Sequence, residues 1–445
     1  MSDSLSIDLA TITSLCKRRG FIFQSSEIYG GIESIWDYGP LGVELKNNIR
    51  QHWWKHMVWK RSDMVGLDSS IIMHPNTWET SGHISNFNDP LIECSSCNKR
   101  WRNDELEKLI CPSCNNELDE PRMFNLMFKT QMGPITETSS EIYLRPETAQ
   151  GIFVNFDNVL KSSRKKIPFG IAQAGKAFRN EITTRNFIFR TREFEIMELE
   201  YFVNPADAEE WFNYWSTESL KWIQSLGIAE SNLRIRQHQD SELAHYSKAT
   251  SDIEYKFPWG WGEVAGIANR TDYDLKSHSA ATNSNLSYFN ESEKTHITPY
   301  VIEPTFGLDR IIFMLLVDAY TSEEVSTSTN KIEQRVLLKL NPIITPIKIA
   351  ILPLSRKESL IEIAQGIYND LVSSNTIVGR IEYDDTQSIG KRYRRQDEIG
   401  TPLCITIDFQ SLEDQTVTIR TRDSMDQIRS PINSLVTNIQ EKLTI

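Results

Sequence analysis

Two neighbouring polar segments carry the residue types that a nucleotide site requires. Residues 178–181 read Phe-Arg-Asn-Glu, and residues 194–198 read Phe-Glu-Ile-Met-Glu. Because side chains two positions apart on a strand share a face, Arg179 and Glu181 are predicted to project together. An arginine can bind phosphate, a carboxylate can accept from an exocyclic amine, and an aromatic ring can stack on a base. The pattern predicts two antiparallel strands, joined by a long basic loop, that bind ATP beside a small amino compound.

A third segment argues against the alternative of an ordinary hairpin with a charged outer face. Residues 303–310, Glu-Pro-Thr-Phe-Gly-Leu-Asp-Arg, run directly into the apolar segment 311–317. A glycine turn followed by a buried helix places Arg310 near a helix N-terminus, where anions are favoured. The motif is weak alone, but with the two strands it indicates one anion-binding site.

Four of the six cysteines have the spacing of metal ligands. Cys94 and Cys97 form one pair, and Cys111 and Cys114 form another after a gap of thirteen residues. Two disulfides are the alternative, which a reducing cytoplasm would disfavour. The spacing favours a structural Zn²⁺ site, closed to water because four thiolates fill the tetrahedron.

The composition describes a globular protein of two or three domains. The chain has 445 residues, 39% of them hydrophobic and 24% charged, with a net charge of −12. No apolar run approaches the ~20 residues that span a bilayer, and the first residues do not resemble a secretory signal. We therefore expect a cytoplasmic protein with no membrane partner. A basic run with one tyrosine, residues 391–395, is suited to single-stranded RNA.

Periodicity predicts the elements that must position these groups. Apolar residues spaced by four predict a helix over 40–61, and an aromatic-rich stripe predicts another over 207–226. A strand is expected over 63–75 and a surface loop over 277–292. The last hundred residues alternate strand and helix, which indicates a small α/β domain.

With these motifs in view, the chain resembles a known family. Segments 178–198 and 303–310 resemble motifs 2 and 3 of class II aminoacyl-tRNA synthetases, and the whole chain is similar to the dimeric glycyl-tRNA synthetases. Further matches follow in the order of that family: Asp37–Gly42, Asn76–His83, Arg145–Gly151, Ala268–Leu275 and Ser388–Pro402.

The resemblance implies an α+β fold with three parts. A class II catalytic domain on an antiparallel sheet is expected over 1–340, with a zinc-knuckle insertion at 91–121. A linker is expected over 341–346 and an α/β anticodon-binding domain over 347–445. The helix and strand over 40–75 would form the dimer contact. The implied activity is ligation of glycine to tRNA(Gly) through glycyl-adenylate, with ATP as substrate, Mg²⁺ and structural Zn²⁺ as metals, and a homodimer as the assembly.

The resemblance also nominates site residues. Arg179, Glu181 and Arg310 would be catalytic. The residues implied to bind ATP are Arg179, Asn180, Glu181, Phe189, Arg190, Thr191, Arg192, Glu193, Phe194, Glu263, Val264, Gly307, Leu308, Asp309 and Arg310. The residues implied to bind glycine are Arg102, Glu147, Phe194, Glu195, Ile196, Met197, Glu198, Glu303, Pro304, Thr305, Phe306 and Gly307. Thr305 stands where a serine is expected in this family.

Two other classes of protein remain as alternatives. A catalytically inactive, synthetase-like nucleic-acid-binding subunit, as in a polymerase accessory protein, would be expected to lose the phosphate and ammonium ligands. Arg179, Glu198 and Arg310 are all present here. A zinc-ribbon RNA-binding protein would explain the cysteines and leave both ATP motifs unexplained. The enzyme is therefore the favoured interpretation.

Overall fold

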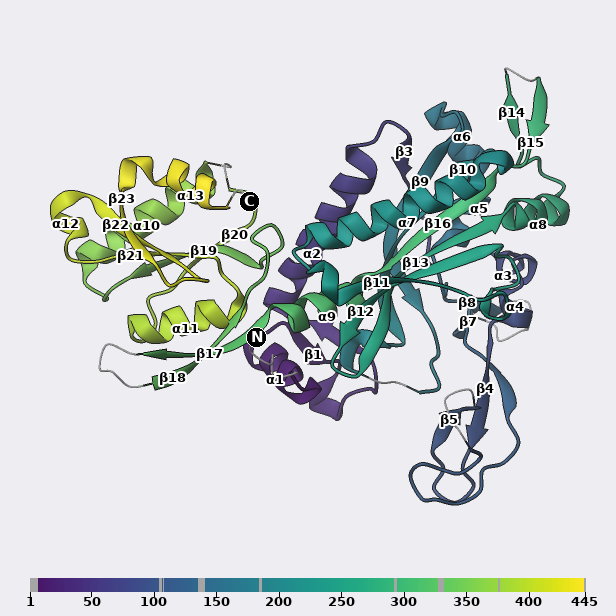
Figure 1. The fold of residues 1–445 in the computed structure, drawn as a ribbon, viewed down its shortest axis with the longest axis horizontal. Helices are drawn as coiled ribbons and strands as arrows, with labels where there is room; N and C mark the ends of the chain where they lie inside the picture. Colours follow the sequence, from purple (N-terminus) through teal and green to yellow (C-terminus); the bar gives the residue numbers. More distant parts are fainter. Residues whose placement is uncertain are drawn as a thin grey trace.

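The structure, a computed structural model, describes residues 7–103, 106, 108–134, 141–183, 186–291, 294–326, 332–374 and 377–443. A large body surrounds a seven-stranded sheet, and a smaller body surrounds a five-stranded sheet (Figure 1). A small module that contains β4 and β5 projects from the large body. Within the described ranges, no helix has both the length and the apolar character needed to cross a membrane.

The central sheet has the strand order β11-β12-β13-β16-β10-β9-β3. Neighbouring strands are antiparallel, except that β3 and β9 are parallel. The strands are β3 (Met64–Gly66), β9 (Phe169–Phe178), β10 (Glu193–Val203), β11 (Leu233–Gln237), β12 (Ala249–Phe257), β13 (Gly260–Thr271) and β16 (Tyr300–Gly307). The predicted antiparallel pair is thus β9 and β10, two interior strands of the sheet rather than an isolated hairpin.

Three long helices cover one face of this sheet. They are α2 (Pro40–Trp54), α7 (Ala208–Ser225) and α9 (Leu308–Ala319). Met197 and Leu199 of β10 point into the same hydrophobic core as Trp215 and Trp222 of α7. Since side chains alternate along a strand, Glu198 must point to the opposite face. Burial of the apolar face therefore fixes which side of the sheet carries the polar groups.

Shorter helices cover part of the opposite face. They are α5 (Ala149–Val154), α6 (Phe156–Ser163) and α8 (Tyr273–Thr282). Phe153, Phe156 and Leu275 from these helices pack on Phe169 and Phe202 of the sheet. The helices cover only one end of the face, which leaves the rest available for a cavity.

The other elements of the large body form its periphery. They are α1 (Leu9–Arg19), β1 (Ile22–Gln24), β2 (Trp36–Tyr38), α3 (Pro75–Thr80), α4 (His83–Asn86), β4 (Asn88–Glu93), β5 (Arg100–Arg102), β6 (Arg122–Asn125), β7 (Lys129–Gln131), β8 (Glu141–Tyr143), β14 (Tyr288–Asn290) and β15 (Thr295–Ile297). The hairpin of β17 (Tyr320–Ser326) and β18 (Ile332–Leu338) lies beside α11 (Ile389–Ile399) of the smaller body (Figure 1). A π-helical turn, Lys55–Trp59, extends α2.

The smaller body is an α/β sandwich, as the sequence predicts. Its sheet has the order β20-β19-β21-β22-β23, with β19 parallel to both of its neighbours. Its elements are β19 (Ile347–Pro353), α10 (Glu358–Ser373), β20 (Arg380–Tyr383), α11 (Ile389–Ile399), β21 (Leu403–Ile407), α12 (Ser411–Asp414), β22 (Thr416–Thr421), β23 (Gln427–Pro431) and α13 (Leu435–Leu443). Helices α10 and α13 share one apolar core with the sheet, and α11 packs on its other face.

Three local predictions are wrong. β9 ends at Phe178, so Arg179 and Glu181 follow the strand instead of lying on it. The strand expected over 63–75 is confined to β3, because Pro75 begins α3. The loop expected from 277 contains the end of α8 and then β14; Ser292 at its end lies outside the described residues.

Candidate active site

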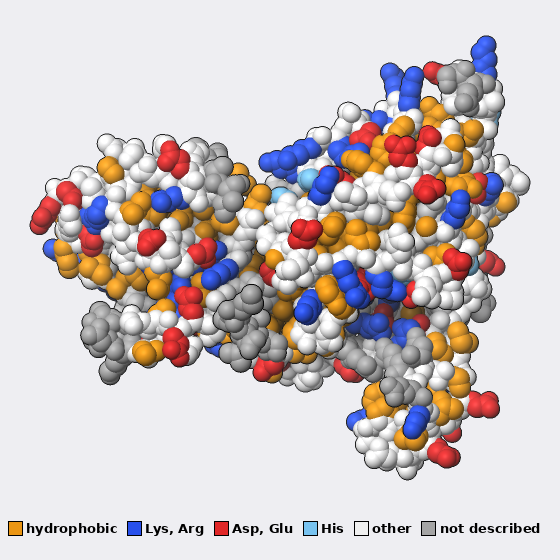
Figure 2. Space-filling model, in the orientation of Figure 1, with side chains coloured by type: hydrophobic (Ala, Val, Ile, Leu, Met, Phe, Trp, Pro, Cys, Tyr) orange, Lys and Arg blue, Asp and Glu red, His pale blue; other side chains and the backbone are white. Residues whose placement is uncertain are grey.

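A cavity opens on the polar face of the central sheet, where β10, β13 and β16 meet the loop after β9 and the start of α9. Its lining is Arg179, Glu181, Ile188, Phe189, Arg190, Thr191, Phe194, Glu195, Ile196, Glu263, Thr305, Gly307, Asp309 and Arg310. Most of the residues predicted to contact ATP therefore share one cavity, although they come from three separate segments. Figure 2 shows Lys and Arg side chains gathered in the hollow between the large body and the β4–β6 module.

Arg179 is held between two aromatic rings at this cavity. Its guanidinium lies 5.3 Å from the ring centre of Phe194 and 5.3 Å from that of Phe87, a distance at which cation–π attraction operates. Its Nε donates to the carbonyl of Pro146 at 3.1 Å. These contacts leave the remaining guanidinium nitrogens available to an anion in the cavity.

Arg310 lies in the first turn of α9 and contacts both the loop after β9 and strand β13. Its guanidinium stacks over the ring of Phe189 at 4.6 Å, and its Nε donates to the Phe189 carbonyl at 3.1 Å. Its Nη1 donates to the Glu263 carbonyl and pairs with the Glu263 carboxylate, both at 3.1 Å. The loop between β9 and β10 is thus anchored to β13 and α9, although residues 184 and 185 of that loop lie outside the described part.

Glu181 offers a carboxylate that is not fully satisfied. Its side chain is buried, and its Oε2 has no hydrogen-bond partner among the described residues. Burial raises the pKa of Glu181, and the positive charges of Arg190 and Arg179 partly offset that rise. A buried acceptor without a donor is costly, so this oxygen is suited to accept an N–H from a bound ligand.

Glu198 is the most firmly held carboxylate of the site. Its Oε2 accepts from the backbone N of Thr148 at 3.1 Å and from Thr148 Oγ1 at 2.5 Å. Its Oε1 accepts from Thr305 Oγ1 at 2.8 Å. The hydroxyl of Thr305 is therefore used to orient Glu198, and its methyl group is left to shape the cavity wall.

Glu147 and Glu303 are arranged around a buried arginine. Arg270 is 1% exposed and donates from Nη1 to both oxygens of Glu303, at 3.1 and 3.0 Å. Its Nε and Nη2 donate to Asp274 at 2.9 and 3.0 Å. Burial would raise the pKa of Glu147, but the charges of His83 and Arg270 outweigh burial and lower it. The acidic cluster is thus partly neutralised from within.

Other predicted residues lie near the site, but most of their side chains do not line the cavity. Glu195 pairs with Lys46 at 2.7 Å and Arg50 at 3.2 Å, on the side of α2. Side chains packed in the hydrophobic core can contact a ligand only through the main chain; these are Met197, Val264, Phe306 and Leu308. Two of the remaining residues form ion pairs: Glu193 with Lys176, and Arg102 with Asp89. Arg192 donates to the carbonyl of Glu33. The backbone N of Asn180 donates to the carbonyl of Leu126. None of these side chains lines the cavity except Glu195.

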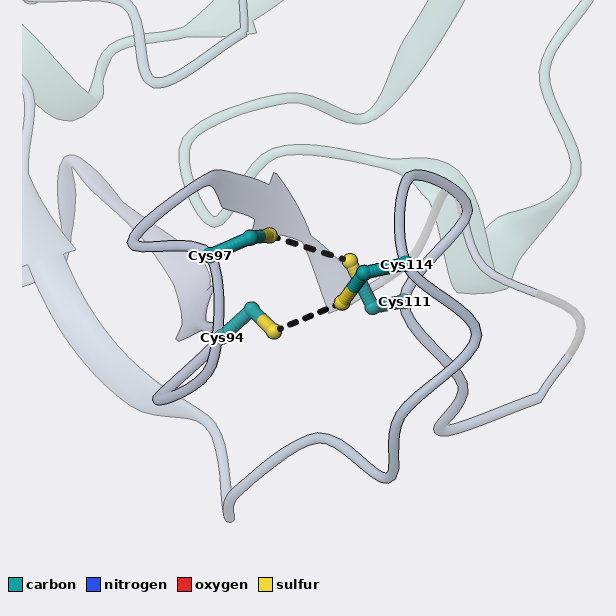
Figure 3. A group of neighbouring side chains, drawn as sticks. All are labelled: Cys94, Cys97, Cys111 and Cys114. Atoms are coloured by element: carbon teal, nitrogen blue, oxygen red, sulfur yellow. Dashed lines mark hydrogen bonds between the residues drawn. The ribbon is translucent and has the colours of Figure 1, made fainter.

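The four cysteines come together as the spacing predicts (Figure 3). Cys94 and Cys114 have their sulfurs 3.5 Å apart, and Cys97 and Cys111 have theirs 3.6 Å apart. All six cysteines in the described residues are free thiols. The sulfurs are too far apart for disulfides, but four sulfurs at ~2.3 Å from one Zn²⁺ would be about 3.8 Å from one another. The donor set and its size fit a zinc ion.

The basic run 391–395 lies on α11, and one of its arginines is buried instead of exposed to a partner. Arg392 is 1% exposed and donates to the carbonyls of Pro353 and Asp384, so the prediction that Arg392 contacts RNA is wrong. Lys391 and Arg394 line a cavity that Arg19 of α1 and Glu333 of β18 also border. On a helix, successive residues face different directions, and burial of one position leaves its neighbours at the surface.

Sequence reasoning missed several residues that organise the site. Thr148, Arg270 and Asp274 lie inside segments that match the family, yet only the fold shows that they bind the site carboxylates. Phe87, which stacks on Arg179, lies in a segment without a recognisable motif. One signal was available: Arg270 follows the apolar run 264–268 and precedes Asp272 and Asp274, and a buried arginine requires an acidic partner.

Comparisons with known proteins match both bodies of the chain. The family of tRNA synthetase class II core domains (G, H, P, S and T) matches residues 128–319, and the family of anticodon binding domains matches residues 348–442. Glycine–tRNA ligase of Treponema denticola is 50% identical over 443 residues, covering 98% of this chain and 97% of that protein. Glycine–tRNA ligase of Clostridium acetobutylicum is 51% identical over 473 residues, covering 100% of both chains.

A solved structure shares the fold at a much lower identity. The crystal structure of prolyl-tRNA synthetase from Cryptosporidium parvum, complexed with halofuginone and AMPPNP, matches with a TM-score of 0.68. It is 15% identical and covers 100% of this chain and 77% of that one. At this identity the likeness supports the architecture and nothing more specific.

Proposed function

The chain belongs to the glycine–tRNA ligases, and from this membership we propose how its cavity activates glycine. The protein is an aminoacyl-tRNA synthetase with glycine, ATP and tRNA as its substrates. The catalytically inactive alternative has no support, because curated relatives across nearly the full chain are ligases. The observation that carries the proposal is the single cavity shared by Arg179, Phe194 and Arg310.

ATP is proposed to bind with its adenine between Phe194 and Arg310 and its phosphates along the arginines. Arg179 would neutralise the α-phosphate, and Arg190, which lines the cavity, would bind the outer phosphates. Arg192 would join Arg190 only by leaving the carbonyls of Glu33 and Glu181. The partnerless oxygen of Glu181 would accept from the adenine amino group. The glycine carboxylate then attacks the α-phosphorus and pyrophosphate leaves. Positioning and charge stabilisation supply the catalysis, without a protein nucleophile.

Glycine is proposed to bind through its ammonium group, with Glu147, Glu198 and Glu303 as the acidic partners. The donors on Glu198 fix its carboxylate before the ligand arrives, which reduces the ordering cost of binding. Exclusion of alanine must be steric, because one methyl group changes affinity by only ~1–3 kcal/mol in an adjustable pocket. The methyl group of Thr305, at the cavity wall, is placed to oppose a larger substrate.

The activity test is glycine-dependent exchange of pyrophosphate into ATP. Purified protein is expected to exchange with glycine, and to do so at least ~10-fold less well with alanine. The measurement is incorporation of labelled pyrophosphate into ATP, with serine as a second competitor. Exchange that does not depend on glycine would reject the proposed chemistry.

Structural zinc at the four cysteines is part of the proposal. Bound Zn²⁺ would hold the module that carries β4 and β5 together, because structural zinc contributes folding energy directly. We expect about one zinc per chain, with loss of zinc in Cys94→Ser and in Cys111→Ser. Cys404→Ala, which alters a buried thiol in the smaller body, is the matched control and should retain zinc. Equal metal content in all three variants and the parent would contradict this assignment.

The finer organisation follows from the same membership. We propose that Glu263 holds the Mg²⁺ that accompanies ATP, since its carboxylate lines the cavity and is only half-buried. Domains over 1–340 and 347–445, with the linker between them, are proposed as the catalytic and anticodon-binding parts. Lys391 and Arg394 would contact tRNA, and a homodimer would form through α2 and β3. A cytoplasmic location is proposed, because charged tRNA is consumed where translation occurs.

A further inference from the structure

Glu200 is a buried acid that the proposed chemistry does not use. It lies on β10, two residues beyond Glu198 and therefore on the same face of the sheet. Its side chain is 0% exposed, and neither of its carboxylate oxygens has a hydrogen-bond partner among the described residues. Ligand oxygens of Glu198, Glu200 and Glu303 all lie within 4.8 Å of one another.

The neighbouring positive charge is already committed to other acids. Arg270 divides its nitrogens between Glu303 and Asp274, and its contact with Glu147 is longer, at 3.9 Å. Glu198 is satisfied by neutral donors, two from Thr148 and one from Thr305. Among the described residues, Glu200 therefore has no cation of its own.

An ionised carboxylate in this position would be strongly disfavoured. Burying an uncompensated charge costs several kcal/mol, and like charges at short range raise that cost. Burial raises the pKa of Glu200 well above its usual range, Glu303, Glu198 and Asp274 raise it further, and Arg270 acts in the opposite direction. The neutral acid keeps an O–H that can be donated, whereas the anion would have only unpaired acceptors.

We infer that Glu200 is a neutral carboxylic acid and acts as a positioning residue, which fills the space beside Glu198 and Glu303 without adding a negative charge. This inference rests on the proposed function where it assigns those two carboxylates to the glycine ammonium group. Burial also raises the pKa of Glu303, and the charge of Arg270 opposes that rise. A neutral Glu200 therefore spares the cluster a further negative charge beside the carboxylates proposed to meet glycine.

The protonation state is tested with Glu200→Gln, which is neutral at every pH and nearly the same shape. The infrared difference spectrum between parent and variant should show a C=O stretch of a neutral carboxylic acid that only the parent has. Glu210→Gln, an exposed change on α7, is the matched control and should show only a carboxylate band. A carboxylate band in the Glu200→Gln difference would overturn the inference.

Stability against pH gives a second measurement. The unfolded chain loses the Glu200 proton above the ordinary value of 4.5, while the folded state keeps it. The folded parent therefore loses stability as pH rises from 5 to 8, whereas the variant has no such group. The folding equilibrium constant of the parent should fall relative to Glu200→Gln by up to about tenfold per pH unit. Parallel curves across this range would show that Glu200 is ionised in both states.

Enzyme kinetics distinguish a positioning role of Glu200 from a requirement for negative charge at that residue. In pyrophosphate exchange, Glu200→Gln should leave the KM for glycine within about twofold of the parent, whereas Glu200→Ala should raise it about tenfold without changing the KM for ATP. An equal rise in both variants would show that negative charge at Glu200 is needed, which overturns the neutral-acid role. If the parent shows no glycine-dependent exchange, the proposed function fails, while the infrared and stability results still decide the state of Glu200.

Discussion

Glu198→Gln is expected to lower kcat/KM for glycine by about 10²- to 10³-fold, the size of effect typical of losing one partner of a buried charge pair. The substitution keeps the shape and removes the charge that the ammonium group would meet. It also turns one acceptor oxygen into an NH₂ group that would face the donors of Thr148 or Thr305. The measurement is pyrophosphate exchange at varied glycine and, separately, at varied ATP.

The KM for ATP should change little, because Glu198 lies outside the set of residues that line the nucleotide cavity. Glu209→Gln, an exposed change in the first turn of α7, is the control and should retain parental kinetics. A loss shared equally between glycine and ATP would instead indicate a general collapse of the sheet face. Such a result would contradict the proposed role of Glu198 in binding the ammonium group.

Arg270→Met is expected to lower the free energy of unfolding by about 3–5 kcal/mol, the cost typical of leaving buried charges without their partner. Arg270 donates to both oxygens of Glu303 and both oxygens of Asp274, and Gln150 adds one neutral donor to Asp274. Methionine fills a similar length but supplies no donor. The measurement is urea denaturation followed by far-UV circular dichroism, compared at one pH.

Arg234→Met is the matched control, because that arginine pairs with Glu254 from a half-exposed position on β11. Its substitution should cost less than about 1 kcal/mol. The double variant Arg270→Met with Glu303→Gln should recover part of the stability lost in the single variant, since it removes one uncompensated charge. If the double variant is no more stable than the single one, charge compensation is not the reason for the loss.

Much of the site was predictable because short-range sequence patterns determine it. Alternation in residues 194–200 placed Phe194 and Glu198 on one face, and the antiparallel pairing of β9 with β10 agrees with it. The glycine before Leu308 and the apolar run after it predicted the helix that carries Arg310. Cysteine spacing predicted the four-sulfur cluster. These features depend on backbone geometry over a few residues, which the chain specifies directly.

The rest depended on contacts between segments far apart in the chain. A periodicity of two tells which face a side chain occupies, but it does not identify the partner on the next strand or helix. Arg392 and Lys391 are neighbours of like charge, yet only Arg392 is buried against backbone carbonyls. The roles of Arg270 and Glu200 could be assigned only from the structure, because burial shows which acids share the one guanidinium.

The sequence by itself therefore determined the inventory of this protein: its strands and helices, its thiol cluster, and the acids and arginines available for nucleotide chemistry. The tertiary structure alone decided which arginine binds an anion and which neutralises a carboxylate, and which acid is left without a counter-charge. The physical reason is that solvation and charge pairing act across space. The energy of a buried ionisable group is set by neighbours that linear spacing does not reveal.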